Sequence, residues 1–140
     1  MVDRPTLEEL IDAARMHIET EVIPAIKGDA KLYFQTLVAI NVLRVAEREL
    51  TLGWSHLQAE WRRLDRLEGE AQIMPASPTE AAAALRVRNA GLCGRIRAGA
   101  YDAKAGELVA HLRATVREAL EVANPKFLQT VESEKPASAV

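Results

Sequence analysis

The sequence has one cysteine, no marked excess of charge of either sign and no long apolar run. Cys93 alone cannot form a disulfide within the chain or a Cys-x-x-Cys metal site. Lysine and arginine number 18 against 20 aspartates and glutamates, for a formal net charge of -2, so the positive field that attracts nucleic acid is missing. The most apolar stretch, residues 32–46, is interrupted by polar side chains and is shorter than the roughly 20 residues of a membrane-spanning helix. We therefore expect partners other than nucleic acid or membranes.

The chain also lacks the marks of a secreted or a repetitive protein. It begins with the polar and acidic residues Met1-Val2-Asp3-Arg4, where a secretory leader has a basic segment followed by an apolar one. Together with the single cysteine, this favours the reducing cytoplasm. The 140 residues suit one domain, and no internal repeat divides them.

What the sequence does contain is apolar residues at helical spacing, and no segment shows the strict alternation of a half-buried strand. The second predicted helix is apolar on most faces and is expected to lie at the centre of the fold, with Gly53 as its C-cap. We predict an all-α fold, a compact bundle of about five helices that forms a single domain over residues 1–128 and is followed by a disordered polar tail over residues 129–140. Caps, prolines and glycines place the helices at residues 6–23, 30–52, 55–68, 78–98 and 104–124.

The apolar faces of these helices predict the core. Its members are aliphatic or aromatic and recur three or four residues apart. Cys93 lies on one such face and resembles a small buried hydrophobe, with a reactive thiol as the open alternative. The predicted core consists of Leu10, Ile11, Ile18, Phe34, Leu37, Val38, Val45, Leu85, Leu92, Ile96, Leu112, Val116 and Leu120.

No catalytic or metal-binding motif is apparent. The glycines at Gly91, Gly94 and Gly99 do not follow a strand, so they do not indicate a phosphate-binding loop. The Glu-x-x-His spacing of a metal site in a helical bundle does not occur, and Glu107 with His111 one turn later is typical of a surface pair. We therefore predict no catalytic residue, no metal and no cofactor, and we expect a protein that is not an enzyme.

Two asparagines interrupt otherwise apolar faces. Asn41 is in line with Phe34 and Val45, and Asn89 is in line with apolar residues of the fourth predicted helix. A buried amide needs hydrogen-bond partners, so the favoured hypothesis is that Asn41 and Asn89 bind each other in the core. The alternative is a ligand pocket formed by Asn41, Arg48 and Asn89, in which Arg48 would bind an anion.

Several short strings, in this order, resemble a family of small helical bacterial proteins, a domain of unknown function encoded beside aminoglycoside-phosphotransferase-like kinases and acyl-CoA dehydrogenases. They are Arg4-Pro5-Thr6, Val38-Ala39 with Asn41, Arg95-Ile96-Arg97-Ala98-Gly99, and His111 to Val116 leading to Asn124-Pro125-Lys126-Phe127. Arg44 departs from the pattern, in which an apolar residue is commoner. The resemblance implies an accessory role beside a kinase in an acyl-CoA-related pathway, by gene company and not by chemistry.

Two functions follow from these observations. The first is a non-catalytic accessory or interaction module that partners a phosphotransferase-like kinase, with a homodimer as a further possibility. The second is a small-ligand-binding bundle for a CoA-type or acyl phosphate anion, with its pocket around Asn41, Arg48 and Asn89. The first is favoured, because no recognisable site stands out in the sequence.

Overall fold

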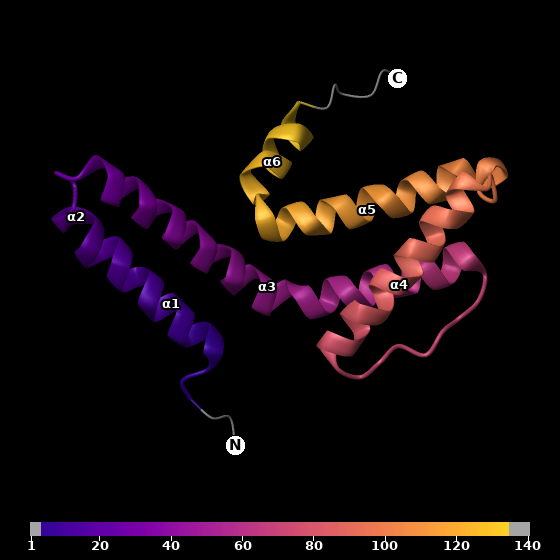
Figure 1. The fold of residues 1–140 in the computed structure, drawn as a ribbon, viewed down its shortest axis with the longest axis horizontal. Helices are drawn as coiled ribbons and strands as arrows, with labels where there is room; N and C mark the ends of the chain where they lie inside the picture. The colour runs from indigo at the N-terminus through magenta and orange to yellow at the C-terminus, as the bar shows by residue number, and fades with distance from the viewer. Residues whose placement is uncertain (1–3, 135–140) are drawn as a thin grey trace. The chain divides into compact units, whose positions relative to one another are not determined.

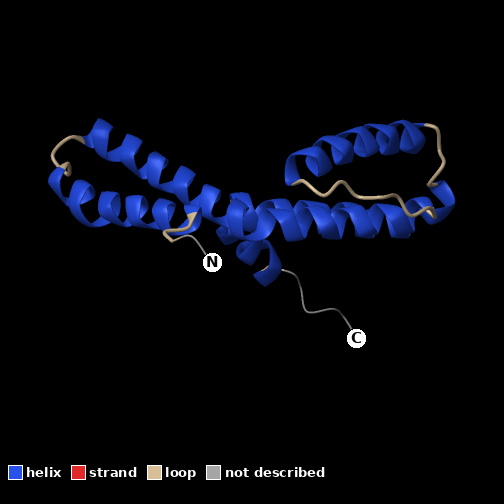
Figure 2. Ribbon diagram, turned by 90° about the horizontal axis from the view of Figure 1, so that it is seen from below, coloured by secondary structure: helices blue, strands red, loops and turns tan. Residues whose placement is uncertain are grey.

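A computed structural model describes residues 4–134 and is all-α, as the sequence predicts. Within this range the helices are joined by turns and loops, of which the longest precedes α4 (Pro78–Arg97), and no strand is present (Figure 2). None of the helices in residues 4–134 has an apolar stretch that could cross a membrane. The contacts within the chain gather into two compact units, Met1–Gly53 and Trp54–Val140. Whether residues 1–128 form a single domain stays a prediction.

The first unit is a helical hairpin, in which α1 (Leu7–His17) lies beside the first part of α3 (Ala30–Glu68) (Figure 1). α1 begins with the capping box that the sequence indicates. The Glu9 amide donates to the Thr6 hydroxyl at 3.2 Å, and the Thr6 amide donates to the Glu9 carboxylate at 2.8 Å. These bonds satisfy backbone donors that a helix start otherwise leaves unpaired.

Pro24 shapes the turn of the hairpin. A π-helical turn, η1 (Ile18–Val22), follows α1 and leads into the short α2 (Ile23–Ala25), which contains Pro24 in its first turn. Proline has no N–H and crowds the carbonyl four residues earlier, so a wider turn just before it relieves the helix. α3 then begins after Asp29, whose side chain accepts a hydrogen bond from the Leu32 amide at 2.9 Å.

An ion-pair network joins the two arms of the hairpin. Arg15 of α1 donates to Glu47 of α3 at 2.8 Å and to Glu19 at 2.9 Å, and it also binds Asp12. Arg44 of α3 reaches Glu19 as well. The Arg15 side chain is only 17% exposed, so these pairs are better shielded than isolated surface pairs, which contribute little.

α3 runs without interruption through Gly53, so the prediction of two helices separated by a C-cap at Gly53 is wrong. One glycine inside a helix costs about 1 kcal/mol, and continuous backbone hydrogen bonding with apolar side chains on both sides outweighs that cost. Ser55, the predicted N-cap of the next helix, accordingly lies inside α3.

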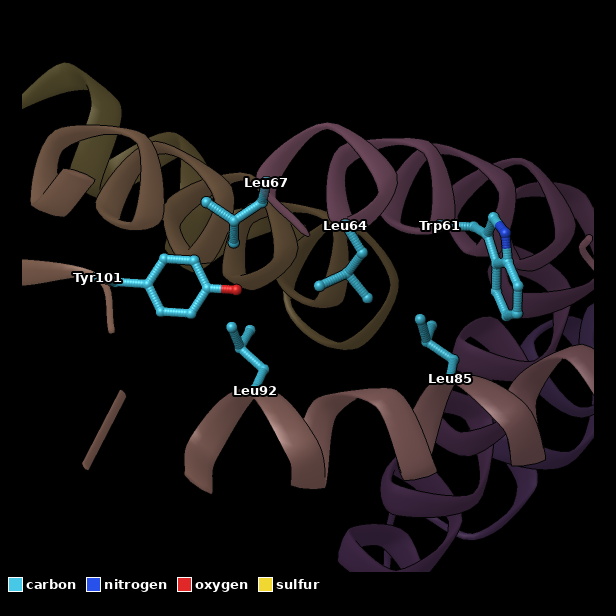
Figure 3. Packing of buried hydrophobic residues seen from close by; sticks show 6 residues of the cluster. All are labelled: Trp61, Leu64, Leu67, Leu85, Leu92 and Tyr101. Atoms are coloured by element: carbon cyan, nitrogen blue, oxygen red, sulfur yellow. The ribbon is translucent and has the colours of Figure 1, made fainter. Parts of the chain in front are cut away.

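The core of the second unit lies where the last part of α3 packs on α4 (Pro78–Arg97) (Figure 3). α4 starts where the sequence predicts, with the Ser77 hydroxyl accepting from the Glu80 amide at 3.2 Å. It ends before Gly99, whose positive φ of 78° suits glycine. The core residues shown in Figure 3 are Trp61, Leu64, Leu67, Leu85, Leu92 and Tyr101.

Two further helices complete the second unit. A short turn, η2 (Asp102–Lys104), leads into α5 (Ala105–Ala123), and α6 (Pro125–Ser133) follows. Asn124 and Pro125 end α5 as predicted, but they also start α6, because the Asn124 side chain accepts from the Phe127 amide at 3.2 Å and proline suits the first position of a helix. Residues 129–133 are therefore helical and not part of a disordered tail. Glu134 is the C-cap of α6, and residues 135–140 of the predicted tail lie outside the described range.

The predicted core is correct in the second unit at Leu85 and Leu92 and wrong at several other positions. In α3, Phe34 is 66% exposed and Val38 is 48% exposed. Cys93 is also exposed rather than a small buried hydrophobe. Helical periodicity identifies an apolar face without showing whether the same chain covers it. The predicted core residues that are exposed are Leu10, Phe34, Leu37, Val38, Leu112 and Val116.

Candidate functional site

The structure does not support a buried pair of Asn41 and Asn89. Asn41 is exposed on α3 in the first unit, so its amide does not need a partner in the core, and the favoured hypothesis of the sequence analysis is wrong. Asn89 belongs to α4 in the second unit, where its side-chain amide donates to Glu60 at 2.9 Å. Arg48 is half-buried in the first unit. The structure therefore assigns Asn41 and Arg48 to one unit and Asn89 to the other.

A charged cluster in the second unit replaces the predicted polar pair. Arg88 of α4 is 8% exposed, and its guanidinium lies 4.5 Å from the ring centroid of Trp61 on α3. It pairs with Glu68 at 2.6 Å and with Asp65 at 2.9 Å. A weakly hydrated guanidinium can stack on an aromatic ring while it binds carboxylates, which an ammonium does less well.

Arg95 extends this cluster toward the end of α4. It binds the second oxygen of Glu68 and donates from Nε to the Tyr101 hydroxyl at 3.4 Å. Two guanidinium nitrogens of Arg88, Nε and Nη1, are buried without a hydrogen-bond partner in the described part of the chain, and the Trp61 ring is the group against which the guanidinium lies. The cluster borders a pocket of about 330 Å³ that Gln72 and Val87 also line.

The spacing of Arg88 in the sequence could have indicated its burial, but a charged residue is usually assigned to the surface. Arg88 lies three residues after Leu85 and four before Leu92, on the same buried face of α4. An arginine at such a position either forms ion pairs in the interior or extends its charged end to solvent. Arg88 forms ion pairs. The carboxylates that bind it lie on α3, at positions that look like a solvated face.

His111 of α5 is buried, which contradicts the prediction of a surface pair with Glu107. Burial lowers its pKa from the ordinary value of 6.5, and the charge of Arg63 lowers the pKa further, against the weaker opposing effect of Glu60. Arg63 itself is bound by both carboxylate oxygens of Glu118 at 2.6 Å. The His111 Nδ1 atom has no hydrogen-bond partner among the described residues. The surroundings of the His111 imidazole thus disfavour its protonated form.

An apolar groove lies between α5 and α6 in the second unit, with a volume of about 590 Å³. Arg117 crosses between the two helices and binds Glu132 of α6 as well as Glu121 of α5. Several of the apolar side chains are exposed, Val116 by 59% and Leu112 by 42%. The groove is lined by Val109, Leu112, Arg113, Ala114, Val116, Arg117, Leu120, Leu128, Val131 and Glu132.

These features combine ion pairs with apolar packing. Among residues 4–134, no group of three or more histidine, cysteine, aspartate or glutamate side chains is placed to hold a metal ion. The carboxylates that surround Arg88 and Arg63 are engaged in ion pairs. The predicted residues Asn41, Arg48 and Asn89 do not line the pocket beside Arg88 or the groove between α5 and α6.

The second unit is thus a helical module that combines a paired charged cluster with an open apolar groove. A family model, the domain of unknown function DUF6285, matches residues 24–127, which is most of the chain, and the protein belongs to this family. No curated protein and no solved structure shows a significant match.

The charged cluster yields a first prediction. Arg88→Met keeps an apolar side chain against Trp61 but leaves Asp65 without its cation and Glu68 with Arg95 alone. Removing one member of a largely buried ion pair should lower the free energy of unfolding by about 3 kcal/mol. In urea denaturation, the control Arg62→Met, an exposed position of α3, should change that free energy by less than about 0.5 kcal/mol. Equally small effects of both variants would show that the cluster does not stabilise the fold.

His111 yields a second prediction. Because burial lowers the pKa of His111 in the folded protein, the unfolded state binds more protons near and below the ordinary pKa of 6.5. The free energy of unfolding should therefore fall as the pH is lowered from about 7 to about 5. His111→Leu should flatten this dependence, whereas His17→Leu, an exposed position of α1, should retain it. Parallel pH profiles for the wild type and His111→Leu would contradict the burial of an unprotonated imidazole.

Proposed function

We propose that the protein is a non-catalytic accessory module that binds a phosphotransferase-like kinase in an acyl-CoA-related pathway. The observation that supports an interaction role is the apolar groove between α5 and α6. The identity of the partner rests on the family resemblance of the sequence strings and not on the groove.

The groove has the character of a docking surface for a helix or an extended segment of another protein. Apolar side chains at positions 109, 112, 116 and 120 follow each other along one face of α5, and Leu128 and Val131 of α6 form the opposite wall. A soluble protein rarely leaves such a continuous apolar surface uncovered unless it binds something. Grooves of this kind accept the apolar face of an amphipathic helix.

The charges at the rim fit the same role. Arg117 is bound to Glu121 and Glu132, which holds α6 against α5 and keeps the walls of the groove in place. Arg113 is exposed at the edge and is free to meet an acidic residue of a partner. Charged residues at the rim of an interface mainly steer and orient a partner, while apolar residues at its centre provide most of the affinity.

The test is affinity capture from extracts of the native cell, with the captured proteins quantified by mass spectrometry. The wild type should retain a phosphotransferase-like protein in stoichiometric amount. Val116→Glu, which puts a charge on the apolar wall of the groove, should reduce that amount about tenfold or more. Val87→Glu is the matched control, because Val87 is an exposed valine of α4 that does not line the groove.

Two outcomes would reject the proposal. One is the absence of any kinase-like protein from the captured fraction. The other is equal capture by Val116→Glu and Val87→Glu, which would mean that the groove is not the binding surface.

A further inference from the structure

The first unit has much less buried core than the second. Among the buried hydrophobic residues of the described chain, Ile40 alone belongs to Met1–Gly53. A unit of about 50 residues is already near the size at which one core barely stabilises a fold. The hairpin therefore has apolar side chains to bury and too few neighbours within its own unit to cover them.

These side chains form a stripe on α3, here called the α3 stripe, that consists of Phe34, Val38, Asn41 and Val45. The spacing of four, three and four residues keeps them on one side of the helix. Phe34 is 66% exposed and Val38 is 48% exposed. Val42, beside the stripe, is 60% exposed.

The α3 stripe faces away from α1. Glu47, which binds Arg15 of α1, and the buried Ile40 mark the side of α3 that faces its partner arm. Val45 and Val38 each precede one of these residues by two positions, which is about 200° around a helix. The two faces of α3 are thus nearly opposite, and one of them is covered by α1.

Two charges flank the α3 stripe in a pattern that fits a second copy of the chain. Lys31 and Glu49 are both exposed, and neither has an ion-pair partner in residues 4–134. They are 18 residues apart, or about five turns of 3.6 residues, so they project in the same direction. When two such helices pack antiparallel around a twofold axis, the lysine of each copy lies beside the glutamate of the other. A parallel pair would instead gather both lysines at one end and both glutamates at the other.

Asn41 fits the same arrangement. It lies one residue, or about 1.5 Å along the axis, from the midpoint between Lys31 and Glu49, so the twofold axis would bring the two copies of Asn41 together. An amide both donates and accepts hydrogen bonds, so it can pair with its own copy, which a charged side chain cannot. A single polar residue within an apolar contact is a known way to fix the register of paired helices.

We propose that a second copy of the chain covers the α3 stripe, with the two α3 helices antiparallel and Asn41 at the twofold axis. The two hairpins then pack through their α3 helices, and each α1 lies on the side of its α3 that faces away from the interface. The interface uses the first unit alone, and it does not depend on the proposed function of the groove in the second unit.

The first test is sedimentation equilibrium of the full chain from about 1 to about 100 µM. We expect a species of twice the chain mass of 15.4 kDa. Val38→Glu should raise the dissociation constant about tenfold or more, because it puts two charges into the apolar contact. Val87→Glu, the exposed valine of the second unit, should leave it unchanged. A monomer throughout this range would overturn the proposal. Equal association of Val38→Glu and Val87→Glu would also overturn it, because the α3 stripe would then not be the interface between copies.

Charge reversal provides a second measurement, which does not depend on Val38→Glu keeping its fold. Lys31→Glu and Glu49→Lys should each weaken association, and the double variant should restore it, because the opposite charges meet again. In a parallel pair each position would face its own copy, so charge reversal would only exchange one like-charge contact for another. Association that is the same for the wild type, both single variants and the double variant would therefore contradict the antiparallel arrangement.

Cross-linking tests the direction of the helices. In the Cys93→Ser background, a mixture of Lys31→Cys and Glu49→Cys chains should form disulfides between positions 31 and 49 on oxidation. Products that join 31 to 31 and 49 to 49 would contradict the antiparallel arrangement. Val116→Glu, which is expected to impair the groove, should leave all of these results unchanged, so failure of the two proposals can be told apart.

Discussion

The uneven burial of side chains along α3 is the constraint on which the rest of the structure depends. In its last part, Trp61, Leu64 and Leu67 are spaced three residues apart and each is at most 5% exposed, because α4 and Tyr101 pack over them. In its first part, one arm of a hairpin covers one face and the other face is open. A helix in water is stabilised mainly by the packing of its apolar face, so the two ends of the same helix differ in how much of their stability comes from the chain itself.

Ion pairs surround the apolar contact between α3 and α4 in the second unit. Arg88 of α4 lies over the Trp61 ring, and Glu68 of α3, which binds Arg88, also binds Arg95. Arg63 of α3 and Glu118 of α5 form a similar pair beside His111. Because these charges are matched within the unit, they contribute to fixing how α4 and α5 pack on α3. The groove between α5 and α6 differs from this region, because it is lined mainly by apolar side chains.

Local signals in the sequence predicted local structure well. Ser77 and Pro78 place the start of α4, and Thr6 with Glu9 places the start of α1, because a cap depends on residues within one turn of each other. Gly53 misled because glycine marks the end of a helix only when the backbone turns left-handed there, and the following residues here continue the helical spacing. Pro125 ends one helix and starts the next, a double role that the pattern alone does not distinguish.

Burial and site residues were harder to predict, because they depend on contacts between distant segments. Asn41 lies on an apolar stripe, and periodicity predicted its burial without indicating that α1 covers the opposite face. Arg88 was missed because a cation on a buried stripe becomes intelligible only when its partners on another helix are known. The sequence therefore predicted the class of fold and several helix boundaries, whereas the candidate site came from the packing.

The most direct test of this account is native-state hydrogen exchange measured at several protein concentrations. If association covers the first part of α3, protection of amides in residues 33–45 should increase with concentration, because binding adds to the stability of the bound form alone. Amides in residues 57–67 should show protection that does not change, since their core lies within one chain. Protection of residues 33–45 that is independent of concentration would contradict the central claim that the first unit depends on a second copy for its stability.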